Sequence, residues 1–159
     1  MKLYSKFDTS HELFKSLFEL IKSTNPLLKH KSLKRLSFII FSAEKDHFNS
    51  YYQELLSPIM SGLRDAIHSD LVIEYFTLLR VIFLKFSTLN DPSKDAAKNL
   101  QMLWPHILFK LYRIYDEFSA PDIIQEGFKL LNVIEHLSLE DSKLLQWAFV
   151  IDCNLLHNR

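Results

Sequence analysis

The residues that could carry metal or acid-base chemistry are dispersed along this chain of 159 residues. Its seven histidines include no pair three or four positions apart, the spacing at which two imidazoles on one helix bind the same metal ion. Cys153 and His157 are four apart, but a metal site needs further ligands and the sequence nominates none. Asp116 and Glu117 point about 100° apart on a helix. A solvated helix end is therefore a simpler interpretation than a catalytic carboxylate pair.

Nucleotide binding and acyl transfer have no better support. Gly62 and Gly127 are the only glycines, and both lie in segments with a helical pattern. A phosphate-binding loop or a nucleophile elbow needs glycine in a turn, so close packing of helices is the simpler role for both residues. We therefore predict a protein that is not an enzyme, with no catalytic residue, no metal site and no cofactor.

Composition and charge restrict the class of partner. The 19 basic residues balance the 19 acidic ones, and the aromatic residues follow core spacing, so we predict no nucleic-acid binding. A single cysteine cannot form an internal disulfide, as expected for a protein that does not depend on an oxidising compartment. No apolar run approaches the roughly 18 residues of a membrane span. Any membrane contact is expected to be peripheral.

One segment of the chain occurs twice, displaced by 52 residues. Residues 70–82 read DLVIEYFTLLRVI and residues 122–134 read DIIQEGFKLLNVI. Apolar residues at helical spacing cover two sides of the first copy, so this helix must be covered on both sides. We predict that helices 70–86 and 122–137 are central and equivalent. Helix pairs that repeat every 40 to 50 residues or so are typical of an all-α, HEAT/armadillo-like α-solenoid. The side chains expected to be buried are Phe76, Phe128, Leu79 and Leu131.

Capping residues and prolines divide the chain, interpreted as the single domain 1–159, into about seven helices. Residues 9–12 have capping-box spacing, which predicts a first helix over 10–23. Asn25 before Pro26 predicts that the second helix begins at Pro26, and Pro58 predicts a kink in the third. The other expected elements are helices at 46–67, 70–86, 103–115, 122–137 and from 138 onward, with a long loop over 88–99.

The second helix carries the only compact basic cluster. Three of its basic side chains fall within about a 100° arc, away from an apolar side that includes Leu28. The cluster consists of Lys29, Lys31, Lys34 and Arg35. One hypothesis is direct binding to an anionic, phosphoinositide-containing membrane, with each basic residue contributing on the order of 1 kcal/mol. The alternative is that Lys31, Lys34 and Arg35 form a solvated helix face, for which pairing with Glu44 or Asp46 is an optional addition.

The segment 139–156 is poor in charge, which leaves a helix there with too few polar positions for a free outer face. The end repeat of a solenoid has no further neighbour, so this face favours a homodimer or a contact with another helical protein. The residues expected at that protein interface are Leu145, Trp147, Phe149 and Leu155. For Trp147, as for Trp104, packing in the core is the alternative.

Four segments, in order, resemble the C-terminal region of Dopey proteins: residues 33–48 (LKRLSFIIFSAEKDHF), 75–86 (YFTLLRVIFLKF), 103–105 (LWP) and 146–150 (QWAFV). The resemblance implies the final domain of a very large peripheral membrane protein on the cytoplasmic face of Golgi and endosomal membranes. It also implies partners in membrane trafficking, namely a large HEAT-repeat scaffold related to Arf exchange factors and P-type lipid flippases. The family offers no catalytic motif.

Overall fold

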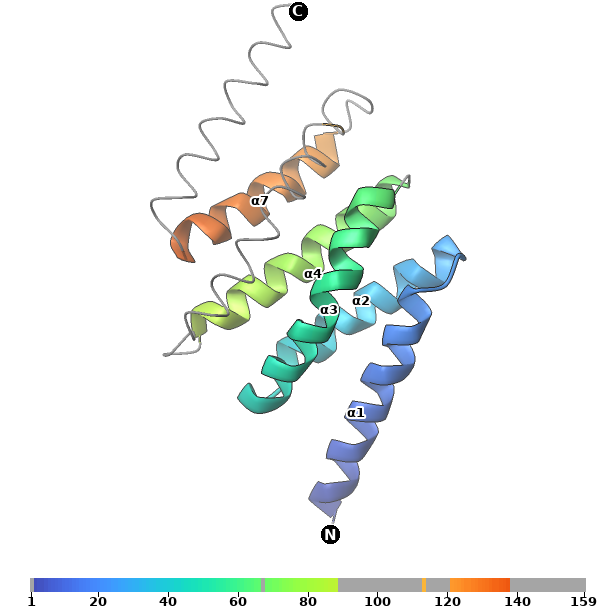
Figure 1. The fold of residues 1–159 in the computed structure, drawn as a ribbon. Coiled ribbons are helices and arrows are strands. Elements are labelled where there is room, and N and C mark those ends of the chain that lie inside the picture. Colours follow the sequence, from blue (N-terminus) through green and yellow to red (C-terminus); the bar gives the residue numbers. More distant parts are fainter. Residues whose placement is uncertain (1, 67, 89–112, 114–120, 138–159) are drawn as a thin grey trace, which may run out of the picture.

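The computed structural model describes residues 2–66, 68–88, 113 and 121–137. These residues form five α-helices (Figure 1), and the described part of the chain is all-helical, as predicted. The helices are α1 (Lys2–Ile21), α2 (Pro26–Ser42), α3 (Lys45–Asp65), α4 (Ser69–Thr88) and α7 (Pro121–Leu137). The loop expected over 88–99 and the helices expected at 103–115 and after 138 lie outside the described residues.

The predicted helix boundaries agree with the structure except at the start of the chain. The second helix begins at Pro26, and α3, α4 and α7 begin within one residue of their predicted starts. The prediction for α1 is wrong, because this helix begins at Lys2 and not at Ser10. Capping-box residues also fit a helix interior, and no proline or glycine among residues 2–10 stops the helix. The α3 helix continues through Pro58, and the kink predicted there stays a prediction.

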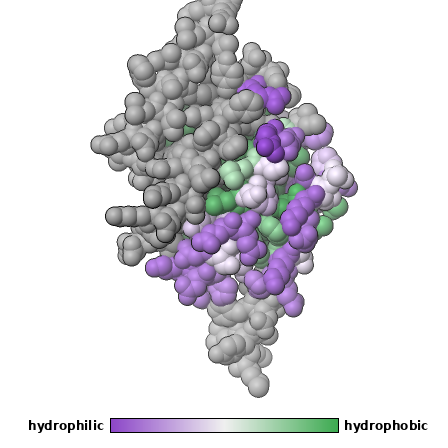
Figure 2. Space-filling view, viewed as in Figure 1, coloured by the Kyte–Doolittle hydropathy of each residue, from purple (hydrophilic) through white to green (hydrophobic). Residues whose placement is uncertain are grey.

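Helices α2, α4 and α7 lie side by side, with α4 in the middle (Figure 1). The first helix packs on α2, and α3 crosses over α2 and α4. In the same view, Figure 2 shows hydrophilic side chains over much of the described surface, with hydrophobic ones between them. The central helix α4 therefore has neighbours on several sides, which its two-sided apolar pattern requires.

The core is built mainly from α4 and the helices around it. Buried residues of α4 that belong to this core are Leu71, Val72, Tyr75, Phe76, Leu78, Leu79, Ile82 and Phe83. The facing side of α2 contributes Leu33, Leu36, Ile39 and Ile40. The prediction of a central helix is thus confirmed for α4.

The two copies of the repeated segment agree at the leucine pair and differ at the phenylalanine. Leu79 and Leu131 are 0% and 3% exposed. Phe76 is 1% exposed, whereas Phe128 is 45% exposed, so the prediction that Phe128 is buried is wrong. Among the described residues, α4 has α2, α3 and α7 as neighbours, but the main neighbour of α7 is α4. The equivalent phenylalanine is therefore buried in α4 and partly exposed in α7.

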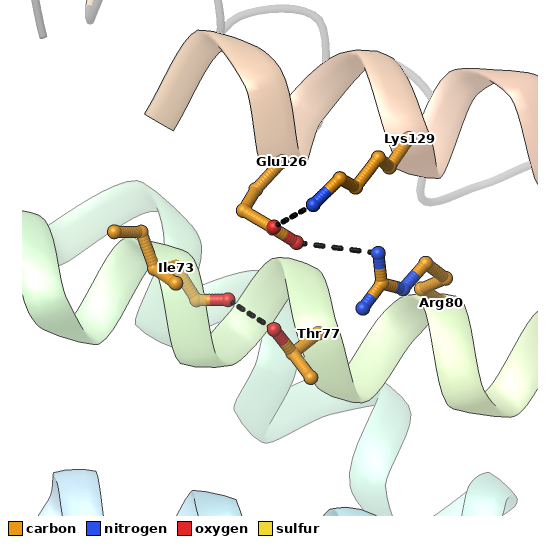
Figure 3. Close-up of polar contacts among 5 residues, drawn as sticks. All are labelled: Ile73, Thr77, Arg80, Glu126 and Lys129. Carbon is orange, nitrogen blue, oxygen red and sulfur yellow. Dashed lines mark hydrogen bonds and ion pairs between the residues drawn. The ribbon is translucent and has the colours of Figure 1, made fainter. Parts of the chain in front are cut away.

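Equivalent glutamates of α4 and α7 reach back to the preceding helix in the row. Glu74 of α4 contacts His30 of α2, with Oε1 and Nε2 3.3 Å apart. Glu126 of α7 contacts Arg80 of α4, with Oε2 and Nη1 3.4 Å apart (Figure 3). Lys129 approaches the other oxygen of Glu126 at 2.7 Å. The repeated sequence thus makes a similar polar contact at both helix interfaces.

Candidate interaction surface

The start of α2 is fixed by the cap that the sequence predicts. The Asn25 side chain accepts hydrogen bonds from the backbone N–H groups of Leu27 and Leu28 at 3.0 and 3.4 Å. Pro26 has no N–H, so its place in the first turn leaves no donor unsatisfied. The cap thus fixes the residue at which α2 begins.

The outer side of α2 carries a line of five exposed residues that we call the α2 stripe. Its members are Leu27, Lys31, Lys34, Phe38 and Phe41, and the spacing of four and three residues keeps them on one side of the helix. Leu27, Phe38 and Phe41 are 60%, 72% and 64% exposed. Arg35 is exposed beside the stripe. This face therefore combines basic and large hydrophobic side chains.

The basic side chains of this face have no acidic neighbour along the chain. No Asp or Glu occurs between Glu19 and Glu44. Within the described residues, Lys31, Lys34 and Arg35 form no ion pair with Glu44 or with any other carboxylate. Pairing with Glu44 or Asp46 is thus absent there, and the solvated face stays an alternative to a binding face.

Lys29 lies apart from the other three basic residues. It is about 140° from Lys34 around the helix, is half-buried, and lines a cavity of about 450 Å³ between α1, α2, α3 and α4. Tyr75 and Asp65 also line this cavity. Burial raises the pKa of the Tyr75 hydroxyl, and the nearby Asp65 carboxylate raises it further. Of the four predicted basic residues, the structure therefore brings together Lys31, Lys34 and Arg35 and separates Lys29 from them.

The two exposed phenylalanines sit on a well-supported helix end. The Ser42 hydroxyl donates to the carbonyl oxygen of Phe38 at 3.0 Å, and Lys85 of α4 donates to the carbonyl oxygen of Phe41 at 2.8 Å. Terminal carbonyls of a helix otherwise lack partners. Sequence reasoning missed Phe38 and Phe41 as surface residues: their spacing places them on the same side as Lys34 but does not show whether the core covers that side. It also placed Leu28, which is 40% exposed, on the apolar side.

Other kinds of site find no support in the described part of the chain. No group of three or more His, Cys, Asp or Glu side chains there could hold a metal ion. None of the described helices has the length and apolarity needed to cross a membrane. The predicted interface residues of the last segment lie outside the described residues; they are Leu145, Trp147, Phe149 and Leu155.

Comparison with known protein families gives a match over most of the chain. A family model described as DOP1 C-terminal matches residues 14–158, which include all of α2, α3, α4 and α7. No solved structure matches the chain.

Proposed function

The chain belongs to the Dopey family as a DOP1 C-terminal domain, and from this membership we propose that it is a non-catalytic interaction module of a large trafficking scaffold. The scaffold acts as a peripheral membrane protein in transport from endosomes to the Golgi, on the cytoplasmic face of both membranes. The observation that carries the proposal is the family match over residues 14–158. The helical architecture supports it, because rows of helices offer extended faces for partners.

We further propose that the complete domain is a HEAT/armadillo-like α-solenoid of about seven helices. Support comes from the side-by-side order of α2, α4 and α7 and from the similar contacts of Glu74 and Glu126 with the preceding helix. Such contacts at successive interfaces are expected when one unit repeats along a row.

The proposed protein partners are a large HEAT-repeat scaffold related to Arf exchange factors and a P-type lipid flippase. The test is co-sedimentation of the purified 159-residue chain with each purified partner. We expect a stable complex with at least one of them, and a folded chain that binds neither would overturn these partner assignments. Heat-denatured chain serves as the control for non-specific association.

A second proposed function is direct binding to anionic, phosphoinositide-containing membrane through Lys31, Lys34 and Arg35, whereas Lys29 lies apart from this face. It is favoured by the exposure of these three residues and because, among the described residues, none of the three forms an ion pair with a carboxylate. Three basic residues near an anionic surface contribute on the order of 3 kcal/mol. Changing all three to Glu is therefore expected to abolish binding to anionic liposomes without lowering the melting temperature.

A matched charge reversal separates local from global charge effects. Lys15, Lys45 and Arg64 are exposed basic residues on α1 and α3, and changing them to Glu alters the net charge by the same amount. This control is expected to retain liposome binding. Equal loss in both triple variants would contradict a role for α2 in particular, and unchanged binding after reversal on α2 would eliminate its basic face as the site.

A second copy of the chain is a further proposed partner. The apolar segment 139–156 supports a homodimer by its composition, because a segment with few charged residues gains by burying its apolar side chains against another apolar face.

A further inference from the structure

The α2 stripe leaves aromatic side chains in water. Phe38 and Phe41 are the two most exposed large hydrophobic residues of the described chain, at 72% and 64%. They lie one turn apart on the same side of α2, and Leu27 is 60% exposed at the other end of the stripe. Burial of such surface is favourable. A partner that binds the α2 stripe must therefore contact aromatic rings and basic side chains that lie along the same side of the helix.

The backbone that presents these rings is held in place. Lys85 of α4 binds the Phe41 carbonyl oxygen at 2.8 Å, and the Ala43 N–H donates to the Ile40 carbonyl oxygen at 3.3 Å. On the inner side, Ile39 and Ile40 are buried in the core. Because this helix end is anchored at its inner side and at its terminus, the backbone that carries the two rings is already ordered and loses little freedom on binding.

A partner helix fits the α2 stripe only if it carries an acidic residue opposite each lysine. The spacing of four and three residues matches the seam of a coiled coil, so a helix packed there would bury Lys31 and Lys34, which is unfavourable unless each is paired. The surface of a bilayer can bind all residues of the α2 stripe at once. Its basic side chains extend toward lipid phosphates, while its apolar rings enter the boundary below the headgroups. Since α2 contains no acidic residue, charge complementarity selects an anionic bilayer.

We propose that α2 lies along the surface of an anionic membrane and inserts Phe38 and Phe41 into the boundary between headgroups and acyl chains. This inference rests on the membrane-binding function proposed above and adds a hydrophobic component to it. The stripe from Leu27 to Phe41 is about 21 Å long at 1.5 Å per residue. Its basic residues occupy the middle and its hydrophobic residues the ends, so the helix axis lies parallel to the bilayer.

The test measures co-sedimentation of the 159-residue chain with phosphatidylcholine vesicles that contain phosphatidylserine as the minor lipid. Binding is compared at low salt and at about 1 M salt, where the screening length is about 3 Å. The wild-type chain is expected to keep a salt-resistant part of its binding. The Phe38→Ser/Phe41→Ser variant loses this part and binds about hundredfold more weakly at low salt, about tenfold for each ring. Leucine at both positions restores most of the binding.

The matched control is Phe128→Ser, which removes an exposed ring from α7 on the far side of α4 and is expected to bind like wild type. The melting temperature of each variant is measured as well, and only variants that melt at the wild-type temperature enter the comparison. If the double serine variant binds like wild type at both salt concentrations, insertion is overturned while charge-based binding stands. If the wild-type chain binds no vesicles even at low salt, the membrane function itself fails. An equal loss with Phe128→Ser also overturns the assignment to α2.

Discussion

At the scale of single residues, the contact between Gly62 and Tyr75 decides how closely α3 approaches α4. A Cβ atom at Gly62 would overlap the hydroxyl and ring of Tyr75. The sequence predicted close helix packing as the role of this glycine, and for Gly62 the prediction is confirmed. It did not identify Tyr75 as the neighbour, because helical periodicity describes one helix and carries no information on which residue of another helix lies opposite.

Gly62→Ala is expected to destabilise the chain. Alanine favours the helix by about 1 kcal/mol, but overpacking against a buried side chain costs about 1 to 3 kcal/mol. The added Cβ would overlap the ring as well as the hydroxyl of Tyr75, so the ring must shift toward the cavity that both residues line. The two effects together give a net loss of up to about 2 kcal/mol in urea denaturation. Ser61→Ala, at the exposed neighbouring position, is the control and should stay within about 0.5 kcal/mol of wild type. A stabilised Gly62→Ala chain would contradict this contact.

The raised pKa of the Tyr75 hydroxyl predicts that the folded chain loses stability at alkaline pH. Burial, and then Asp65, raise the pKa of its hydroxyl above the usual 10.0. Because the folded state holds this proton more tightly, the contribution to stability is fully present below about pH 10 and is lost as the pH rises through the raised pKa. Tyr75→Phe removes the titration. Denaturation midpoints measured from neutral pH to above pH 10 should therefore fall less steeply for Tyr75→Phe than for wild type, and equal slopes would exclude this role.

At the scale of helices, the sequence predicted correctly those features that depend on neighbouring residues of the same helix. Asn25 and Pro26 predicted the start of α2, and the apolar periodicity of 70–86 predicted the buried helix α4. Prediction failed for the start of α1, where residues compatible with a cap lie inside a helix. It also failed at Phe128, whose exposure depends on the neighbours of α7 and not on its own spacing.

The unequal surroundings of α4 and α7 predict unequal costs for the same substitution. Phe76→Ala should lower the free energy of unfolding by about 3 to 5 kcal/mol, because the ring is fully buried and its loss leaves a cavity. Phe128→Ala should cost less than half as much, since its ring is already 45% in water. Chemical denaturation of both variants gives the comparison. Similar large losses would mean that Phe128 is as well covered as its counterpart.

At the scale of the whole molecule, a net charge of zero conceals a strong local asymmetry. The acid-free stretch between Glu19 and Glu44 includes α2 and contains five basic residues. The cluster was visible in the sequence, but its use was not, because spacing alone could not separate a solvated face from one that also exposes Phe38 and Phe41. The exposure of those rings follows from which side of α2 the core covers, which only the assembled helices determine.

The last prediction concerns self-association through the segment 139–156. A stable dimer needs roughly 800 Å² of buried surface on each chain, and Trp and Phe bury about 150 to 250 Å² each, so Trp147 and Phe149 supply a large share when Leu145 and Leu155 join them. We expect the wild-type chain to sediment as a dimer and Trp147→Ala/Phe149→Ala as a monomer. Serine at Phe38 and Phe41 is the control and should leave the dimer intact, because that face is assigned to the membrane. A wild-type monomer at high concentration would remove the homotypic contact, and dissociation of the control would transfer the contact to α2.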